Sequence, residues 1–522
     1  MKNIISLTLL FIINVSVAFG QGFTSTQIDS LVNKSMEMMP QVGVAVAVIE
    51  NGKIIHSKGY GKLSVNSDEM VDEHTLFQIA SNTKAFTSAG LAILVDQGKL
   101  KWSDRVVQHI PEFTMYNDYV RDNFTIIDLL THRSGLGLGA GDLMFFPPGA
   151  NFTIEDVLNT FQYLKPTSDF RTKYDYDNLL YLVAGEVISR VSGLTYDEFI
   201  ESQILNPLDM DRTAVRYKGL KSKTNIAKAH STNNGEIREI QRYVKGEGAL
   251  VASGGMYSSV HDMSKWLMAQ LNQGKYGDRL ENQIFSSERQ EDMWRPYTSI
   301  GFSPRPRQSY KWHFGAYGLG WFIAHIHNNS VISHSGGLPG MLSMVMIVPE
   351  LNSAVVVLTN GAPGANSYST ISSAIRDEWI GRKRWDYLTN TKEQLGWTEE
   401  SVDSTLNDVW HNATVSNIEK LKANAYLGSY EDKWFGKVNI ENRDGKLWFQ
   451  SQRSPQLNGE MFQFKKNTFA IKMSYTDMQC DAFATFEMDE SENPIRIKMK
   501  GISPNIDFSF DYQDLDLVRI KE

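Results

Sequence analysis

Two groups of strand-like segments, far apart in the sequence, constrain the fold of this chain more than any other feature. In residues 42–59 an apolar run is followed by Asn51-Gly52, a strong signal for a tight hairpin. In residues 320–359 a second hairpin signal is followed by two more apolar runs. The region between them is mostly helical in pattern. We therefore expect an α/β (α+β) fold, in which one antiparallel sheet is built from both ends of the region, is flanked by terminal helices and carries an inserted helical lobe.

The rest of the chain indicates further units. At 522 residues the chain is too long for one small domain. We predict a large first domain over residues 21–390, and a polar, acidic linker over residues 391–420. From residue 421 to residue 522 the apolar residues alternate with polar ones, which predicts a small all-β barrel or sandwich.

The composition and the N-terminal residues limit both the class of function and the cellular location that we expect. The net charge of −8 argues against a dedicated nucleic-acid binder. Residues 1–20 read as a secretory signal peptide that is cleaved before Gln21, so we expect a periplasmic or secreted protein with no membrane anchor. The single cysteine, Cys480, cannot form an intrachain disulfide and is expected to be a packing residue.

A serine and a lysine lie three residues apart at the start of a predicted helix. Ser81 and Lys84 precede an apolar segment over residues 85–95, which ends near Gly98. Positions three apart share a helix face, so the lysine amine would lie beside the serine hydroxyl. A hydroxyl becomes a good nucleophile when a neighbouring base takes its proton. An ordinary amphipathic helix with a surface lysine would give the same pattern.

Two other short motifs each occur once in the chain. Tyr176 and Asn178 form a Tyr-x-Asn motif, and His334 and Gly336 form a His-x-Gly motif. Taken singly, the first pair could cap the helix that follows, and the histidine could be a strand-end residue bonded to backbone. Neither motif carries a function by itself.

Together, the three motifs resemble those of the serine β-lactamase and penicillin-binding-protein family, and most closely its class C β-lactamase, D-aminopeptidase and esterase branch. The resemblance extends over roughly residues 25–390. The segment after about residue 420 is similar to the lipocalin-like tail of some members. Other stretches that match the family are 44–61, 129–136, 206–210, 317–321 and 334–340.

The resemblance implies an acyl-enzyme mechanism without a metal or other cofactor. Ser81 would be the nucleophile, while Lys84 and Tyr176 would share proton transfer, with the identity of the base left open. Asn178 would bind the substrate amide or Lys84. The backbone N–H groups of Ser81 and Gly337 would form the oxyanion hole, and His334 and Gly336 would belong to the substrate-binding strand.

One departure from the family bears on the substrate. β-Lactamases and many peptidoglycan enzymes carry a lysine, which attracts a substrate carboxylate, where this chain has His334. A mostly neutral histidine does this poorly. We therefore expect an esterase, or a peptidase or amidase perhaps acting on D-residues, with a small ester, amide or peptide as its partner. A penicillin-binding D-alanyl-D-alanine carboxypeptidase or class C-like β-lactamase, and a catalytically silent binding or sensor protein, are the alternatives.

Other candidate residues have weaker support. His325 and His327 could form a metal pair, but no third ligand is identifiable, so we predict no metal site. His132 is interpreted as structural, holding the loop beneath the cleft. A run of apolar residues could form an apolar rim to the site or simply pack within its loop. This run comprises Met144, Phe145 and Phe146.

Overall fold

The protein is described here from a computed structural model. The described residues are 22–39, 41–233, 236–241, 247–301, 311–361, 364–382, 404–413 and 423–520. The predicted signal peptide, cleavage before Gln21 and most of the predicted linker lie outside these residues. The signal peptide and its cleavage remain predictions.

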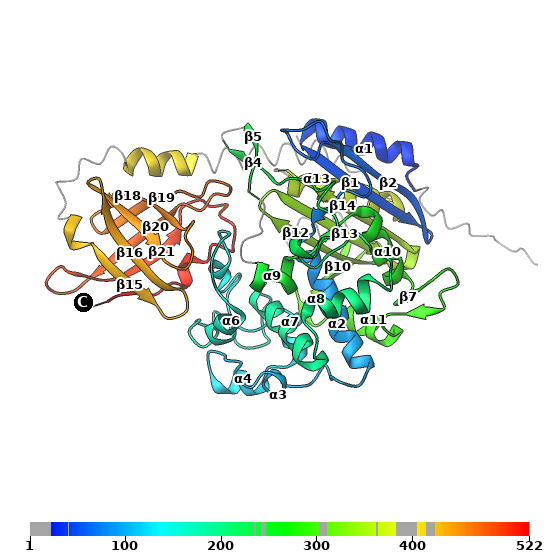
Figure 1. The fold of residues 1–522 in the computed structure, drawn as a ribbon, viewed down its shortest axis with the longest axis horizontal. Coiled ribbons are helices and arrows are strands. Elements are labelled where there is room, and N and C mark those ends of the chain that lie inside the picture. The colour runs from blue at the N-terminus through cyan, green and yellow to red at the C-terminus, as the bar shows by residue number, and fades with distance from the viewer. Residues whose placement is uncertain are drawn as a thin grey trace, which may run out of the picture.

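A single eight-stranded antiparallel sheet is built from the two ends of the first region, as the strand pattern predicted (Figure 1). Strand β1 (Gly43–Glu50) pairs with β14 (Ser353–Thr359), so that Val46 lies opposite Val357. The Asn51-Gly52 turn connects β1 to β2, and the sheet order is β2-β1-β14-β13-β12-β11-β10-β9. The other strands are β2 (Lys53–Gly61), β9 (Thr298–Ser299), β10 (Trp312–Tyr317), β11 (Phe322–Ile326), β12 (Asn329–Leu338) and β13 (Met341–Val348).

Helices cover both faces of the sheet. The N-terminal helix α1 (Ser25–Met38) and the late helix α13 (Gly364–Trp379) pack together on one face, where Val44, Val46 and Val355 are buried. On the opposite face α10 (Val260–Leu271) contacts β1 and β14, and α2 (Thr83–Asp96) lies in the same core cluster. Because the central strands are covered on both faces, they are almost wholly apolar rather than alternating.

The helical lobe follows β2 in the sequence and lies below the sheet in Figure 1, in blue-green to green. Its core shares one continuous hydrophobic cluster with the lower face of the sheet. Short two-stranded pairs also lie outside the main sheet, including β3 (Phe77–Gln78) with β6 (Tyr257–Ser258) and β4 (His230–Asn233) with β5 (Glu236–Glu239). The helices of this region are α2 (Thr83–Asp96), α3 (Val106–His109), α4 (Asp118–Asn123), α5 (Ile126–Leu130), α6 (Ile154–Thr160), α7 (Leu179–Ser192), α8 (Tyr196–Ile200), α9 (Glu247–Gly254), α10 and α11 (Ser287–Met293).

The C-terminal segment forms a closed eight-stranded barrel rather than a sandwich. Its interior is filled by buried side chains such as Tyr430, Phe449 and Phe486. Within the predicted linker, residues 404–413 form a helix whose Trp410 packs on Phe462 of the barrel. The strands are β15 (Gly428–Asp432), β16 (Gly436–Arg443), β17 (Lys446–Ser451), β18 (Asn458–Lys465), β19 (Thr468–Met473), β20 (Ala482–Met488), β21 (Pro494–Gly501) and β22 (Leu517–Arg519).

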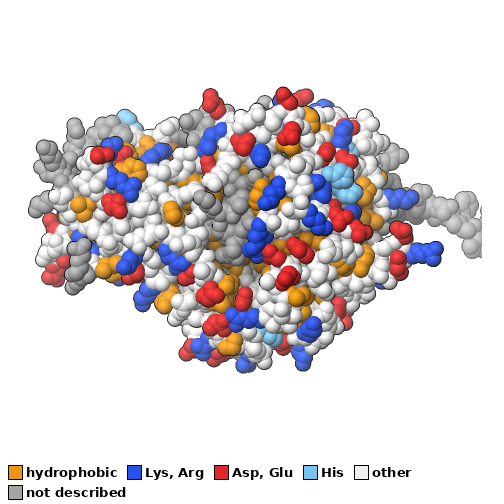
Figure 2. Space-filling model, in the orientation of Figure 1, with side chains coloured by type: hydrophobic (Ala, Val, Ile, Leu, Met, Phe, Trp, Pro, Cys, Tyr) orange, Lys and Arg blue, Asp and Glu red, His pale blue; other side chains and the backbone are white. Residues whose placement is uncertain are grey.

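The barrel is attached to the first region through side-chain contacts as well as through the chain. Arg453 of the barrel pairs with Asp156 of α6 at 2.6 Å, and Asp477 pairs with Arg238 of β5 at 2.7 Å. On the face shown in Figure 2, acidic and basic side chains are interspersed over both parts of the molecule. No helix within the described part of the chain is long and apolar enough to cross a membrane.

Candidate active site

Ser81 lies in a tight turn just before helix α2, not within the first turn of that helix as we predicted. Residues Ala80–Asn82 form a 3-10 turn, and α2 begins at Thr83. Ala80 has a positive φ of 48°, a conformation that costs an alanine free energy and that recurs at functional turns. The prediction that Ser81 lies in the helix rested on the apolar segment over residues 85–95 and on Gly98, and neither of these indicates a 3-10 start.

The nucleophile turn is fixed against the central sheet. The Ser343 hydroxyl of β13 donates to the carbonyl of Ile79 at 2.7 Å, and the Asn82 side-chain amide donates to the same hydroxyl at 2.8 Å. Gly336 of β12 approaches this turn so closely that a Cβ there would lie 3.0 Å from the backbone nitrogen of Ser81. The His-x-Gly glycine is therefore needed for the close packing of strand and turn.

Replacing Gly336 by alanine is expected to lower kcat/KM by about 10²-fold, because displacing a reacting group by roughly 1 Å has an effect of this size. The new Cβ would lie 2.3 Å from the Ile79 carbonyl oxygen, which is backbone and cannot rotate away. Steady-state kinetics measures the loss. The matched control is Gly254→Ala, whose Cβ would lie at an ordinary 3.7 Å from Ala80. Equal activity in both variants would contradict the close approach.

Lys84 is wholly buried beside Ser81. Its Nζ lies 3.2 Å from the Ser81 Oγ, 2.7 Å from the Asn178 Oδ1 and 3.0 Å from the carbonyl oxygen of Ser253. Ser81, Lys84 and Asn178, predicted from separate motifs, thus meet at one point. Ser253, in α9, is a partner that the sequence analysis did not find, because a backbone acceptor leaves no signal in the residue type.

The surroundings of Lys84 favour its neutral form. Burial lowers the pKa of the amine from its usual value to about 7, although the nearby Asp142 and Asp177 partly oppose the shift. A neutral amine has two N–H donors and one lone pair. The Asn178 and Ser253 oxygens can only accept, so they take the two donors and the lone pair is left for the Ser81 hydroxyl. This is the arrangement of a base and its nucleophile.

Tyr176 lies over this amine, with its ring centroid 4.7 Å from the Lys84 Nζ. Burial raises the pKa of the phenol well above 10, although the nearby Ser81 hydroxyl offsets part of the shift. The phenol is therefore protonated at neutral pH. Its ring lies 4.2 Å from that of His132, whose Nδ1 accepts a hydrogen bond from the backbone N–H of Asp177. His132 thus contacts the loop that carries Tyr176.

His334 lies at the pocket wall as a neutral, fully engaged imidazole. Its Nδ1 donates to the carbonyl oxygen of Ser335 at 2.6 Å, so its Nε2 accepts from the Tyr317 hydroxyl at 2.8 Å. Burial, reinforced by the charge of Lys84, lowers the pKa of His334 to about 3. The ring therefore offers a substrate neither a positive charge nor a spare N–H group.

A pocket of about 380 Å³ opens onto Ser81. It brings together the predicted residues Tyr176, Asn178, His334 and Gly337, and its wall is mostly apolar. Among the described residues that line it, Asp507 is the one charged side chain. The remaining residues of its lining include Ala80, Phe146, Tyr174, Ser253, Phe322, Leu338, Leu342, Met478, Phe508 and Ser509.

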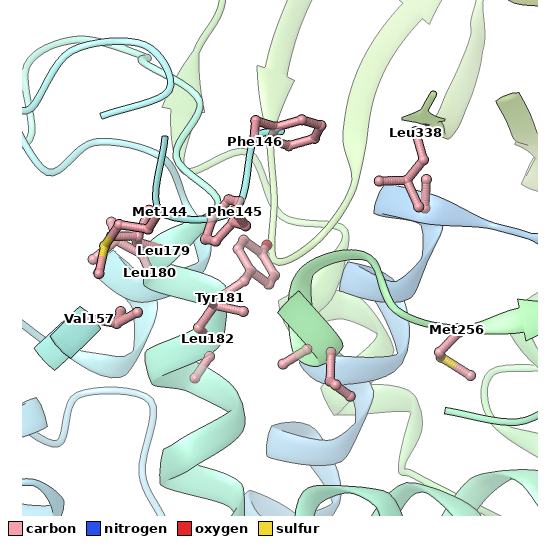
Figure 3. Close-up of a cluster of buried hydrophobic side chains, with 14 of the residues drawn as sticks. Met144, Phe145, Phe146, Val157, Leu179, Leu180, Tyr181, Leu182, Met256 and Leu338 are labelled. Carbon is pink, nitrogen blue, oxygen red and sulfur yellow. The ribbon is translucent and has the colours of Figure 1, made fainter. Parts of the chain in front are cut away.

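The three residues of the apolar run, Met144, Phe145 and Phe146, lie in different environments. Phe146 lines the pocket, whereas Met144 and Phe145 are buried in the core (Figure 3). In that view, Met144 and Phe145 gather against Leu179 and Leu180 at the start of α7. Of the predicted rim, one residue therefore faces the pocket and the other two are packing residues.

The barrel contributes part of the pocket wall, which the sequence analysis missed. Asp507, Phe508 and Ser509 follow strand β21 and line the pocket, and the Phe508 ring lies 5.9 Å from that of Tyr176. Residues more than 300 positions apart meet here, and no local pattern in either segment indicates the contact. His325, which was considered with His327 as a possible metal pair, packs against His313, and no group of three potential metal ligands occurs among the described residues.

Comparison with known proteins identifies the first region. The Beta-lactamase family profile matches residues 28–377, which is most of the chain. The chain belongs to the Beta-lactamase family. A separate profile, described as Domain of unknown function (DUF3471), matches residues 412–519, the segment that contains the barrel. The lipocalin-like character predicted for this segment stays a prediction.

Two curated proteins illustrate what this chain is similar to. Protein flp of Staphylococcus aureus is 28% identical over 343 residues, and the match covers 64% of this chain and 62% of that protein. The chain thus spans less than two thirds of the length of this relative. Unguisins hydrolase ungD of Aspergillus violaceofuscus is 25% identical over 446 residues, covering 80% of this chain and 76% of that protein.

Solved structures share the Beta-lactamase fold. The octameric penicillin-binding protein homologue from Pyrococcus abyssi superposes with a TM-score of 0.60 at 19% identity, over 95% of this chain and 99% of that one. A D-stereospecific amidohydrolase from Streptomyces sp. superposes with a TM-score of 0.52 at 20% identity, over 65% of this chain and 95% of that one. At these identities the likeness shows the fold.

Proposed function

We propose that this protein is a serine hydrolase that forms an acyl-enzyme at Ser81 on small ester, amide or peptide substrates. The observation that carries the proposal is the buried amine of Lys84, with a pKa of about 7, placed 3.2 Å from the Ser81 hydroxyl. Ser81 Oγ attacks the substrate carbonyl carbon while its proton passes to Lys84 Nζ. The bond to the leaving group then breaks, and water releases the acyl group from Ser81.

The remaining site residues have separate roles in this proposal. Lys84 is the better base, because Tyr176 is a neutral phenol at neutral pH. Tyr176 instead passes a proton to the leaving group and later orients the water. The N–H groups of Ser81 and Gly337 stabilise the oxyanion, and Asn178 holds the lysine and the substrate amide. Two similar proteins, unguisins hydrolase ungD and a D-stereospecific amidohydrolase, are named for hydrolysis, which agrees with cleavage of an acyl bond.

A fluorophosphonate probe tests the proposal directly. The probe should label the wild-type protein with one equivalent, and peptide mapping should place the label on Ser81. The labelling rate should be lower at pH 5 than at pH 8, because Lys84 becomes protonated and can no longer take the proton of Ser81. An unlabelled protein, or a label on another residue, would contradict the proposal and favour a silent binding protein on the same fold.

The pocket favours substrates with an apolar acyl group and no carboxylate. Phe146, Phe322 and Phe508 line the cavity, and none of its described lining residues is a lysine or arginine. His334 is neutral and engaged on both nitrogens. β-Lactams and peptides that end in a free carboxylate would find no cation to pair with, so we propose an esterase, amidase or peptidase rather than a β-lactamase.

Replacing His334 by lysine is expected to raise the kcat/KM ratio of a chromogenic cephalosporin to a neutral nitrophenyl ester about tenfold or more, because a charge-assisted hydrogen bond contributes about 1.5–3 kcal/mol. The wild type should favour the ester. The control is His334→Gln, which stays neutral and should leave the preference unchanged. Rapid cephalosporin hydrolysis by the wild type would overturn this view of the substrate.

We also propose that the protein is exported. Support comes from the pattern of residues 1–20, in which a lysine precedes an apolar run and small residues follow.

A further inference from the structure

Asp142 connects the barrel to the catalytic lysine through an unbroken series of hydrogen bonds. Its side chain is fully buried beneath the pocket. The Asp142 Oδ2 accepts from the Asn178 Nδ2 at 2.8 Å and from the Ser509 Oγ of the barrel at 2.9 Å. The Asn178 Oδ1 in turn accepts from the Lys84 Nζ at 2.7 Å. No short sequence motif marked Asp142, which lies in a glycine-rich loop.

A second barrel residue, Asp511, holds the backbone on both sides of Asp142. The buried Asp511 accepts from the Gly141 N–H at 2.7 Å and from the Leu143 N–H at 2.9 Å. The same loop is tied to the catalytic tyrosine, because the Gly139 N–H donates to the carbonyl of Tyr176 at 2.8 Å. The barrel therefore fixes the position of Asp142 through its side chain and through its neighbours.

The hydrogen bond between Asp142 and Asn178 affects the catalytic site because a side-chain amide has two possible orientations. An asparagine can rotate so that its oxygen and its NH₂ group exchange places. Asp142 Oδ2 can accept a hydrogen bond from the NH₂ group of Asn178, and this directs the Asn178 oxygen toward Lys84. In the reversed orientation, the NH₂ group would face the N–H groups of the lysine and would displace the amine from Ser81.

We propose that Asp142 is a positioning residue that sets the orientation of Asn178, and through it the placement of the Lys84 amine, and that Ser509 and Asp511 of the barrel hold Asp142 for this task. The proposal rests on the serine-hydrolase function proposed above. It makes the barrel a structural part of the catalytic centre, because the acceptor that orients Asn178 is itself held by two barrel residues.

Asp142→Ala should lower kcat about 10²-fold, in line with the cost of misplacing a catalytic group by roughly 1 Å. KM should change little, because Asp142 is not among the residues that line the pocket. The acid limb of kcat/KM should move to lower pH, because Lys84 loses a well-placed acceptor that favours its ammonium form. A purely structural role would lower thermal stability without moving this limb.

Asp142→Asn distinguishes hydrogen-bond geometry from general damage to the fold. The asparagine keeps a carbonyl oxygen that accepts from Asn178 and Ser509, so its kcat should stay within a fewfold of wild type. The control is Arg453→Gln, which removes a different barrel contact, the one with Asp156, and should leave kcat and the pH profile unchanged. Wild-type kcat in Asp142→Ala, or an Asp142→Asn loss as large as that of alanine, would overturn the proposal.

A double-mutant cycle tests the role of the barrel. Ser509→Ala should lower kcat severalfold, and the double variant Ser509→Ala/Asp142→Ala should be no slower than Asp142→Ala alone. Additive losses would show that Ser509 acts by another route and would overturn the barrel's part in the proposal. Fluorophosphonate labelling of Ser81 is the separate readout: a wild type that does not label refutes the hydrolase function, whereas a labelled, active wild type with an unaffected Asp142→Ala refutes only this inference.

Discussion

Replacing Ser81 by alanine is expected to reduce kcat/KM for a neutral nitrophenyl ester by about 10⁵-fold, because removal of a catalytic nucleophile leaves only the acceleration due to binding and oxyanion stabilisation. Steady-state kinetics on the purified variant measures the loss. The substitution removes one oxygen from a half-buried turn, so the melting temperature should change by only a few degrees.

Its matched control is Ser335→Ala, which removes a hydroxyl at the same pocket from a residue to which we assign no chemical step. This variant should keep kcat/KM within about threefold of wild type, as expected of a group outside the reaction. If Ser81→Ala retained more than a hundredth of the activity, the acyl-enzyme mechanism would be wrong.

Replacing Lys84 by methionine is expected to lower kcat about 10³-fold, in the middle of the range for general acid–base catalysis. Methionine fills much of the same buried space without an amine, so the loss reports the base rather than a cavity. The control is Lys62→Met, a lysine whose ion pair with Asp68 lies at the surface. Normal turnover in the Lys84→Met variant would show that another group acts as the base.

The pH dependence of the wild type gives an independent measure of the same amine. Burial lowers the pKa of Lys84 to about 7, so the activity should fall as the pH drops below 7 and the amine becomes protonated. Above about pH 8 nearly all of the amine is neutral, and the activity should reach its full value. The pKa of Tyr176 is raised well above 10, so no alkaline limb should arise from it below pH 10. In Lys84→Met the acid limb near pH 7 should be absent from the residual activity.

Local patterns in the sequence were enough to predict the sheet. The Asn51-Gly52 turn and the apolar runs at 42–49 and 354–359 place two strands whose pairing then joins the two ends of the domain. Each of these signals depends on neighbouring residues, and antiparallel pairing follows from the need to bury apolar faces. The closed barrel was predicted less sharply, because alternation alone does not distinguish a barrel from a sandwich.

The closeness of Ser81 and Lys84 was predicted from their spacing on a helix, whereas the approach of Asn178 to them was implied only by the family resemblance. The 3-10 turn at Ala80–Asn82 was missed, because it depends on contacts with β13 that lie more than 260 positions away. The structure also keeps His334 neutral over a wider pH range than its residue type suggested. An isolated histidine titrates near 6.5, whereas burial beside Lys84 keeps this one neutral down to about pH 3.

The barrel's part in the site could not have been predicted from the tail's own residues. Phe508 and Ser509 lie in an irregular segment after β21, and their neighbours Tyr176 and Asp142 lie more than 300 positions earlier in the chain. Asp142 likewise reads as an ordinary loop aspartate in the sequence. Only its burial between Asn178 and Ser509 gives it a role.

The measurement that tests the central claim most directly is the mass of the protein during turnover. Deacylation should be slowed in a Tyr176→Phe variant, so mixing it with a nitrophenyl ester and quenching in acid should leave an adduct with the mass of the acyl group. Peptide mapping should place this adduct on Ser81, and Tyr176→Phe/Ser81→Ala should show none. An ester hydrolysed with no adduct in the single variant, or an adduct on a residue other than Ser81, would contradict the account.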